Sequence, residues 1–176
     1  LLGRGVGYCA VCDGFFYRNK TVVVVGGGNT AVTDALYLSK ICKKVILVHR
    51  RDSLRAEKIL VERLNNAENI EIIFNSEVSE ILGENSANGV LLKSGEKIDC
   101  DGVFIAVGIV PRSNTVKDIV KLDNGGYIVA DENGKTSLDG FFAAGDVRTK
   151  ALRQIITACS DGANCVDSVN KFLDTL

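Results

Sequence analysis

The sequence predicts an α/β fold in which a parallel sheet is followed by an antiparallel β-meander. Between Thr21 and Phe74, apolar runs typical of strands buried on both faces alternate with segments of helical spacing. This alternation implies right-handed βαβ units and hence a parallel sheet. Between Val78 and Ile98 the pattern changes to short strands separated by polar turns, which indicates the meander. A further buried strand ends at Gly108.

The individual elements follow from the same patterns. The apolar runs predict strands at 21–25, 45–48, 70–74 and 103–108. The helical spacing predicts helices at 29–40, 55–64 and 152–173. In the first helix, the expected inward positions are Ala31, Ala35, Leu36 and Leu38. The length of 176 residues suits one domain, or one domain plus part of another.

The composition is that of an ordinary globular protein, with 46% hydrophobic and 24% charged residues. A formal net charge of −1 gives no reason to expect nucleic acid or an anionic membrane as a partner. No apolar run approaches the roughly 20 residues that cross a bilayer. The chain begins at Leu1 without Met and without the regions of a signal peptide, so we interpret its start as an internal cut in a longer protein.

The six cysteines indicate one functional pair and not a disulfide scaffold. A well-cored α/β chain does not need the staples of a small secreted domain. Only Cys9 and Cys12 share a motif, and this pattern favours the cytoplasm. The others are interpreted as buried, small, apolar side chains: Cys42, Cys100, Cys159 and Cys165.

A glycine-rich loop after the first long strand predicts a Rossmann-like dinucleotide-binding domain. Gly26, Gly28 and Ala31 form a Gly-x-Gly-x-x-Ala pattern that follows a buried strand and opens a helix. The glycines permit a tight turn and close approach of a pyrophosphate, and the small third residue lets helix and strand pack closely. Free N–H groups at the helix start then face the phosphates. The other candidate cofactor residues in and near this edge are Asn29, Thr30 and Gly108.

The end of the next strand indicates which dinucleotide binds. An acidic residue about 20 positions after the glycines would favour NAD. Here the strand ends in His49, Arg50 and Arg51, with Arg55 one turn further on. Guanidinium groups suit a 2′-phosphate through charge-assisted, bidentate bonds, so NADP is the predicted nucleotide. His49 is expected to orient the phosphate or to cap the loop; a solvated basic loop is the alternative.

The Cys9–Cys12 pair is a Cys-x-x-Cys motif with three interpretations. Half of a zinc site is disfavoured, because a structural site needs four ligands and the chain offers no second motif. A purely structural cysteine pair is the second possibility. A redox couple is favoured, since one thiol can resolve a mixed disulfide that the other has formed. Asp13 follows directly and is positioned in sequence to move a proton to or from a departing thiolate.

Four separated motifs, taken together, resemble the low-molecular-weight thioredoxin reductases. They are Cys-x-x-Cys-Asp-Gly-x-Phe, Gly-Gly-Gly-Asn-Thr-Ala, His-Arg-Arg-Asp-x-x-Arg-Ala, and a late Gly-Asp-Val followed by Arg-Gln. The resemblance covers essentially the whole chain. It implies a homodimeric flavoprotein whose NADPH domain, carrying the dithiol, is inserted into an FAD domain. Residues 1–112 would then be the NADPH domain, and 113–176 the C-terminal portion of a second, FAD-type α/β domain.

The resemblance also implies residue roles. Electrons would pass from NADPH through FAD to the Cys9–Cys12 disulfide and then to thioredoxin. Cys12 would face the flavin, Cys9 would attack the partner, and Asp13 would act as the acid. The flavin's sugar-alcohol chain would bond Asp146 beside Gly145, and its ring edge would be lined by Arg153, Gln154 and Ile155.

One departure from the family pattern leaves alternatives open. The second glycine fingerprint, which the family uses for FAD near its N-terminus, does not occur in these residues. The chain by itself is therefore expected to hold half of a flavin site. A flavoprotein subunit that reduces a peroxidase partner shares much of the pattern, and a non-catalytic NADP-binding module is the alternative from another class. The family further implies two alternating domain orientations, with hinges just before Gly5 and near Pro111.

Overall fold

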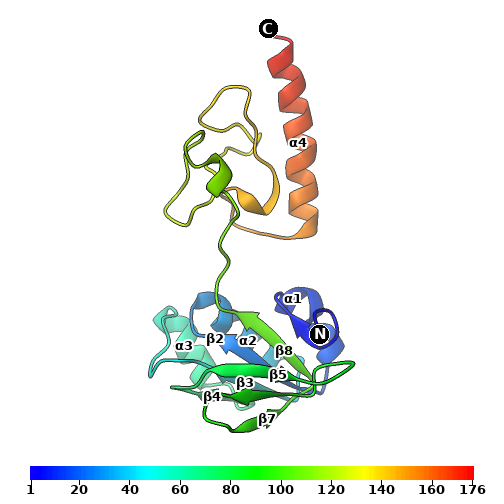
Figure 1. Cartoon of the computed structure of the whole chain (residues 1–176), viewed down its shortest axis with the longest axis vertical. Helices are drawn as coiled ribbons and strands as arrows, with labels where there is room; N and C mark the ends of the chain where they lie inside the picture. Colours follow the sequence, from blue (N-terminus) through cyan, green and yellow to red (C-terminus); the bar gives the residue numbers. More distant parts are fainter. The chain divides into compact units, whose positions relative to one another are not determined.

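The computed structural model describes all of residues 1–176 and divides the chain into two compact units. Unit 1 is Leu1–Gly108 and unit 2 is Ile109–Leu176. Figure 1 colours both units along the sequence. The expected domain boundary after Arg112 lies a few residues beyond this division.

Unit 1 is built on a five-stranded parallel sheet in the order β1-β8-β2-β3-β4 (Figure 1). This confirms the predicted fold class. β8 ends before Gly108, where the chain leaves the extended region at a φ of 109°. The edge strand β1 was not predicted, because two residues carry no alternation pattern. The strands are β1 Val6–Gly7, β2 Thr21–Gly26, β3 Lys44–Val48, β4 Ile70–Ile73 and β8 Gly102–Ala106.

Three helices accompany this sheet: α1 Ala10–Asp13, α2 Asn29–Ser39 and α3 Lys58–Asn65. The expectation that the last of these begins at Arg55 was wrong. The backbone N–H of Arg55 donates to the carbonyl oxygen of Gly27 at 2.7 Å, which ties this segment to the loop after β2. Leu36, expected to face inward, is only partly buried. The buried residues of α2 are Ala31, Val32, Ala35 and Leu38.

The meander forms a separate antiparallel sheet in the order β5-β6-β7, as predicted. The parallel sheet lies between this meander and the helices, because successive side chains of a strand point to opposite faces. Val22 and Val24 pack in the cluster that contains the helices. Val23, between them, packs in the cluster that contains the meander. The meander strands are β5 Val78–Leu82, β6 Gly89–Leu92 and β7 Lys97–Asp99.

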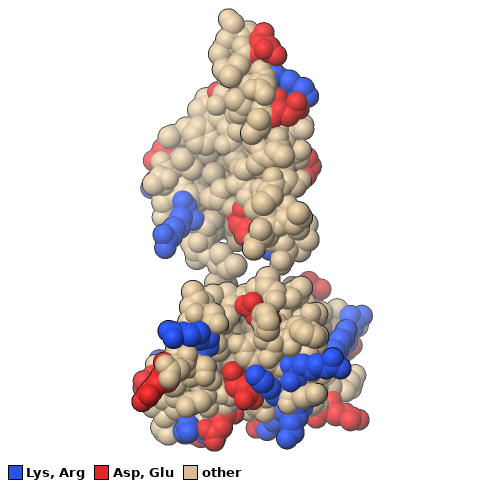
Figure 2. Space-filling view, turned by 90° about the vertical axis from the view of Figure 1, so that its right-hand side faces the viewer, with Lys and Arg blue, Asp and Glu red and all other residues tan.

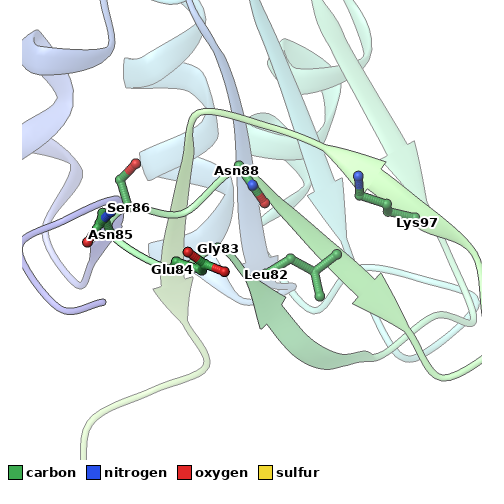
Figure 3. Close-up of a pocket in the computed structure, with 7 residues that line it drawn as sticks. All are labelled: Leu82, Gly83, Glu84, Asn85, Ser86, Asn88 and Lys97. Atoms are coloured by element: carbon green, nitrogen blue, oxygen red, sulfur yellow. The ribbon is translucent and has the colours of Figure 1, made fainter.

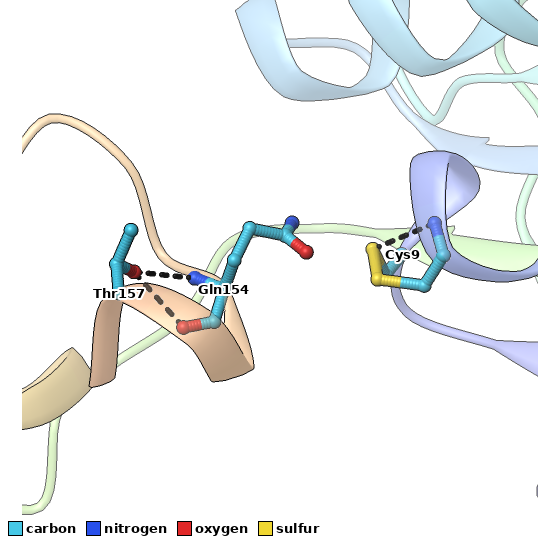
Figure 4. The surroundings of a disulfide bond; sticks show 4 residues. Cys9, Gln154 and Thr157 are labelled. Carbon is cyan, nitrogen blue, oxygen red and sulfur yellow. Dashed lines mark hydrogen bonds between the residues drawn. A yellow bond between two sulfur atoms is a disulfide. The ribbon is translucent and has the colours of Figure 1, made fainter. Parts of the chain in front are cut away.

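Unit 2 contains one long helix, α4 Ile155–Leu173, and no sheet of its own. Its chain is held by isolated bridges around Ile128, which lies in a small core with Val120 and Ala143. α4 was expected to begin at Leu152. It begins later because Gln154 is the N-cap, and its backbone N–H donates to the Thr157 hydroxyl at 3.0 Å (Figure 4).

The surface carries charges of both signs. Figure 2 shows basic side chains interspersed with acidic ones on the face drawn, in keeping with the net charge of −1. The helices include none that is both long and apolar enough to cross a membrane.

Candidate functional site

The predicted nucleotide loop lies at the carboxyl edge of the parallel sheet. β2 pairs with β3 on one side and with β8 on the other, so the strand order reverses at β2. Such a switch point opens a crevice beyond the carboxyl ends of the strands. A cavity of about 500 Å³ lies there. The predicted residues that line it are Gly26, Gly28, Thr30, His49, Arg50, Arg55 and Gly108.

Two glycines of this loop leave no space for a side chain. A Cβ added to Gly26 would lie 2.3 Å from the carbonyl oxygen of Ala106. A Cβ added to Gly27 would lie 2.2 Å from Nδ1 of His49. Gly28, in contrast, has nothing within 4 Å of such an atom. A side chain at Gly26 or Gly27 would thus displace the loop, whereas Gly28 leaves open space beside it for the close approach of a phosphate.

His49 lies beneath the loop and not on the surface. The residue is 5% exposed, and its ring lies against Gly27. Its Nε2 atom is buried without a hydrogen-bond partner. Leaving such a group unsatisfied costs about 1–3 kcal/mol. A polar ligand group that reaches Nε2 would remove this cost, so the cavity fits a nucleotide better than an apolar molecule.

Charged residues also border the cavity. Arg50 and Arg55 are among its lining residues, whereas Arg51 does not line it. All three arginines are exposed. Glu77 lines it as well, and its carboxylate pairs with Lys93 at 2.8 Å. The hydrogen bond from Lys93 lowers the pKa of Glu77, which therefore carries a negative charge beside the two guanidiniums.

Asn29 joins two segments of the site. Its Nδ2 donates to the carboxylate of Glu57 at 2.9 Å, and its Oδ1 accepts from the Glu57 backbone N–H at 2.8 Å. These bonds hold the chain after Arg55 against the start of α2. Ala31, two residues later, is fully buried, which allows the helix to pack closely against the sheet.

Cys9 and Cys12 form a disulfide in the same unit, with their Cα atoms 5.3 Å apart (Figure 4). Cys9 is the N-cap of α1, and its Sγ accepts from the Cys12 backbone N–H at 3.1 Å. Cys9 is half-buried and Cys12 is exposed. The half-buried Asp13 carboxylate lies close to Gly7, where an added Cβ would be 3.0 Å from Oδ2.

The residues expected to contact FAD surround the turn that precedes α4. Gly145 has a φ of 79°, a conformation that side chains disfavour, and Asp146 beside it is exposed. The Arg153 guanidinium lies over the ring of Tyr127, 3.9 Å from its centre. Arg153 Nε also donates to the Asp146 carbonyl oxygen at 3.3 Å. The other two expected residues are the N-cap and the first residue of α4, Gln154 and Ile155.

Comparison with known proteins decides the family. The sequence model of the pyridine nucleotide-disulphide oxidoreductase family matches residues 2–162. The chain belongs to this family. It is 47% identical to the thioredoxin reductase of Treponema pallidum, covering 99% of this chain and 58% of that protein. It is also 47% identical to the thioredoxin reductase of Listeria monocytogenes, covering 100% of this chain and 57% of that protein.

Solved structures agree with the sequence comparison. The thioredoxin reductase of Streptococcus pyogenes superposes with a TM-score of 0.92 at 46% identity, covering 98% of this chain and 58% of that chain. The thioredoxin reductase of Giardia duodenalis superposes with a TM-score of 0.86 at 36% identity, covering 97% of this chain and 58% of that chain. This oxidoreductase chain thus spans less than two thirds of the length of these relatives.

The sequence did not single out every residue that shapes the site of this pyridine nucleotide-disulphide oxidoreductase. Gly27 is as tightly enclosed as Gly26, and the run of three glycines was the available signal. Glu57 and Glu77 carried no motif, because their roles depend on contacts with Asn29 and Lys93 that only the fold creates.

A second depression lies away from the oxidoreductase motifs, at the β5–β6 turn. Figure 3 shows its lining side chains, among them Glu84, Asn85 and Lys97. It contains none of the candidate residues and no glycine loop at a strand end. We assign it no ligand.

The contact between Gly27 and His49 leads to a stability prediction for unit 1. Gly27→Ala should lower the free energy of unfolding of unit 1 by about 1–3 kcal/mol, because the new methyl group overlaps the buried ring. Gly28→Ala is the matched control and should change it by less than about 1 kcal/mol, since its Cβ meets no atom. Urea unfolding of both variants measures this; equal destabilisation would contradict the packing described.

A buried ion cluster gives unit 2 a predicted acid sensitivity. Asp161 pairs with Arg148 at 2.8 Å and with Lys150 at 2.7 Å, and all three side chains are at most 7% exposed. The hydrogen bond from Arg148 holds the pKa of Asp161 well below its ordinary value. A carboxyl with a depressed pKa stabilises the fold above its unfolded pKa, and this contribution is lost as the pH falls toward the folded value.

Unit 2 should therefore lose stability below about pH 4, the range in which an unfolded Asp takes up a proton. Helical circular dichroism of α4 during urea unfolding at pH 7, 4, 3 and 2 measures this loss. The matched control is Arg148→Met/Lys150→Met/Asp161→Asn, which removes all three charges and should show a smaller slope. An identical slope in both proteins would refute the assignment to Asp161.

Proposed function

We propose that the chain supplies the NADPH-binding and dithiol-bearing part of a thioredoxin reductase. The observation that carries the proposal is the Cys9–Cys12 disulfide in the same unit as a glycine-loop cavity bordered by Arg50 and Arg55. A nucleotide that donates hydride and a disulfide that accepts two electrons are the two ends of a disulfide reductase. The names of the relatives support thioredoxin as the disulfide substrate.

NADPH is the nucleotide that fits the cavity. Arg50 and Arg55 supply charge-assisted donors for a 2′-phosphate. The glycine loop that lines the cavity and the start of α2 would receive the pyrophosphate. No carboxylate takes the place at the end of β3 that a ribose-binding acid has in NAD-dependent domains.

FAD is the second cofactor proposed, bound by the complete protein with the help of unit 2. Gly145 and Asp146 would hold its sugar-alcohol chain, and Arg153, Gln154 and Ile155 would border its ring. The fit rests on the positive φ of Gly145, on the orientation of Arg153 by Tyr127, and on the 86% exposure of Ile155. Bound FAD would carry electrons from NADPH to the disulfide.

The dithiol chemistry uses the chain's own residues. A Cys9 thiolate attacks the thioredoxin disulfide, forms a mixed disulfide and displaces one partner thiolate, which takes a proton from Asp13. A Cys12 thiolate then attacks Cys9 Sγ, which displaces the second partner thiolate and restores the Cys9–Cys12 disulfide. The bond from the Cys12 N–H to Cys9 Sγ, seen here at 3.1 Å, would also stabilise negative charge on Cys9.

An exposed apolar surface next to the disulfide supports a protein as the partner. Val11, Phe15 and Phe16 are 60%, 68% and 73% exposed and lie within one short segment beside Cys9 and Cys12. Contiguous apolar side chains left in solvent commonly mark binding surfaces.

We further propose a cytoplasmic homodimer for the complete protein, on the strength of its family resemblance.

Calorimetric titration of the 176-residue chain tests the nucleotide part of the proposal. NADPH should bind at least about tenfold more tightly than NADH, because one charge-assisted hydrogen bond to phosphate contributes about 1.5–3 kcal/mol. Equal affinity for the two nucleotides would contradict the assignment of Arg50 and Arg55. Adenosine 2′,5′-bisphosphate should compete with NADPH, which separates recognition of the 2′-phosphate from contacts to the nicotinamide.

A further inference from the structure

We propose that Asp161, on the first half of α4, is a positioning residue that holds the turn Gly145–Val147 in the shape needed for flavin binding. The inference rests on the proposed function, because it gives this turn its role. Asp161 itself does not contact the cofactor in this account. It acts through the backbone of Gly145, next to the exposed Asp146.

Both oxygens of the Asp161 carboxylate are used. Oδ2 accepts from the Gly145 backbone N–H at 2.9 Å, from Arg148 Nε at 2.9 Å and from Lys150 Nζ at 2.7 Å. Oδ1 accepts from Arg148 Nη2 at 2.8 Å. Gly145 belongs to the turn, and Arg148 and Lys150 follow it. One side chain of α4 therefore binds three residues of the segment that precedes the helix.

The bond to Gly145 fixes the turn at its most demanding residue. The φ of 79° at Gly145 is accessible to glycine at little cost but is not enforced by it. An anchor on the Gly145 N–H therefore removes freedom that glycine would otherwise retain. Arg148 continues the anchoring, because its Nη1 donates to the Thr149 carbonyl oxygen at 3.0 Å.

A burial argument favours a role beyond general stability. Replacing a buried ion group by apolar side chains of similar size is often neutral for stability, so stability alone does not call for two cations around one carboxylate. The cluster does supply an acceptor for the backbone N–H of Gly145. Preorganised loops bind with less loss of conformational freedom.

Two triple variants of the full 176-residue chain separate positioning from stability. Arg148→Met/Lys150→Met/Asp161→Asn removes the charges but keeps an oxygen that accepts from Gly145. Arg148→Met/Lys150→Met/Asp161→Leu removes the charges and the acceptor at nearly the same side-chain volume. Urea unfolding first establishes that the two are equally stable, so that local differences are not caused by global unfolding.

Hydrogen exchange is then measured on a peptide covering residues 144–149, with 163–173 in α4 as the internal reference. The Leu triple should exchange at the turn at least about tenfold faster than the Asn triple, with α4 unchanged, since one lost hydrogen bond of about 1.4 kcal/mol is a factor of ten. In the complete protein, FAD titration of the same two triples should show the same order of affinities. Equal turn exchange in two folded triples would overturn the proposal.

A measurement on the unaltered chain covers the case in which the Leu triple does not fold. The Gly145 amide proton should exchange at least about tenfold more slowly than that of exposed Ala144, because it is bonded to a buried carboxylate. A Gly145 amide that exchanges as fast as Ala144 would overturn the inference. FAD uptake is not required of this chain, which holds half of the proposed flavin site. Failure of the chain to bind NADPH would count against the proposed function instead, and the exchange rates would still decide the role of Asp161.

Discussion

If the proposed function holds, Cys12→Ser in the complete protein should abolish catalytic transfer of electrons to thioredoxin and leave a stable mixed disulfide between Cys9 and the partner. Without the second thiol, the mixed disulfide has no intramolecular resolving group, and turnover should fall by at least about 1,000-fold, as expected when one member of a catalytic unit is removed. Non-reducing gel electrophoresis and mass spectrometry of the reduced variant, mixed with oxidised thioredoxin, measure the adduct.

Cys9→Ser is the matched variant, and it should also lose turnover but form no lasting adduct. Cys12 is the more exposed residue of the pair, so accessibility alone would favour the opposite assignment. An adduct formed by Cys9→Ser and not by Cys12→Ser would reverse the two roles. Cys159→Ser is the control for an exposed thiol outside the motif and should leave exchange unchanged.

Arg50→Ala/Arg55→Ala should weaken NADPH binding by about 10–100-fold while leaving the affinity for NADH nearly unchanged. Each guanidinium lost removes a charge-assisted bond to the 2′-phosphate, which NADH lacks. Calorimetry with both nucleotides measures the two affinities separately, and the ratio between them is the quantity of interest.

Lys43→Ala is the control for the loss of a positive charge. Lys43 is exposed and directly precedes β3, at the end of that strand opposite His49 and Arg50. It should leave NADPH affinity within about twofold, because exposed charges more than a Debye length of about 8–10 Å apart are screened. An equal loss in the control would show that Arg50 and Arg55 act only through net charge.

Much of unit 1 could be predicted from sequence because local pattern and tertiary structure agree there. The Val22 to Val25 run suited a strand buried on both faces, and Gly26 and Gly27 after it make close approaches to Ala106 and His49. The Cys-x-x-Cys spacing likewise predicted the pairing that the structure contains.

What the sequence did not predict depends on contacts between distant residues. The late start of α3 follows from the hydrogen bond between the Arg55 N–H and the Gly27 carbonyl oxygen. The hydrogen bond from Asn29 to Glu57 likewise joins positions far apart along the chain. The burial of Asp161 had no local signal, since a single acid on a helix is usually solvated. Its partners, Gly145, Arg148 and Lys150, reach it only because the fold brings α4 beside the turn that precedes it.

Thiol–disulfide exchange between the reduced chain and oxidised thioredoxin is the measurement that tests the central claim most directly. The chain is reduced, freed of reductant and mixed with an equal amount of thioredoxin, and the thiols of each protein are counted by mass spectrometry after alkylation. The account predicts loss of both thiols at Cys9 and Cys12 and gain of two thiols on thioredoxin for each exchange. Cys9 and Cys12 that remain reduced beside oxidised thioredoxin would contradict it.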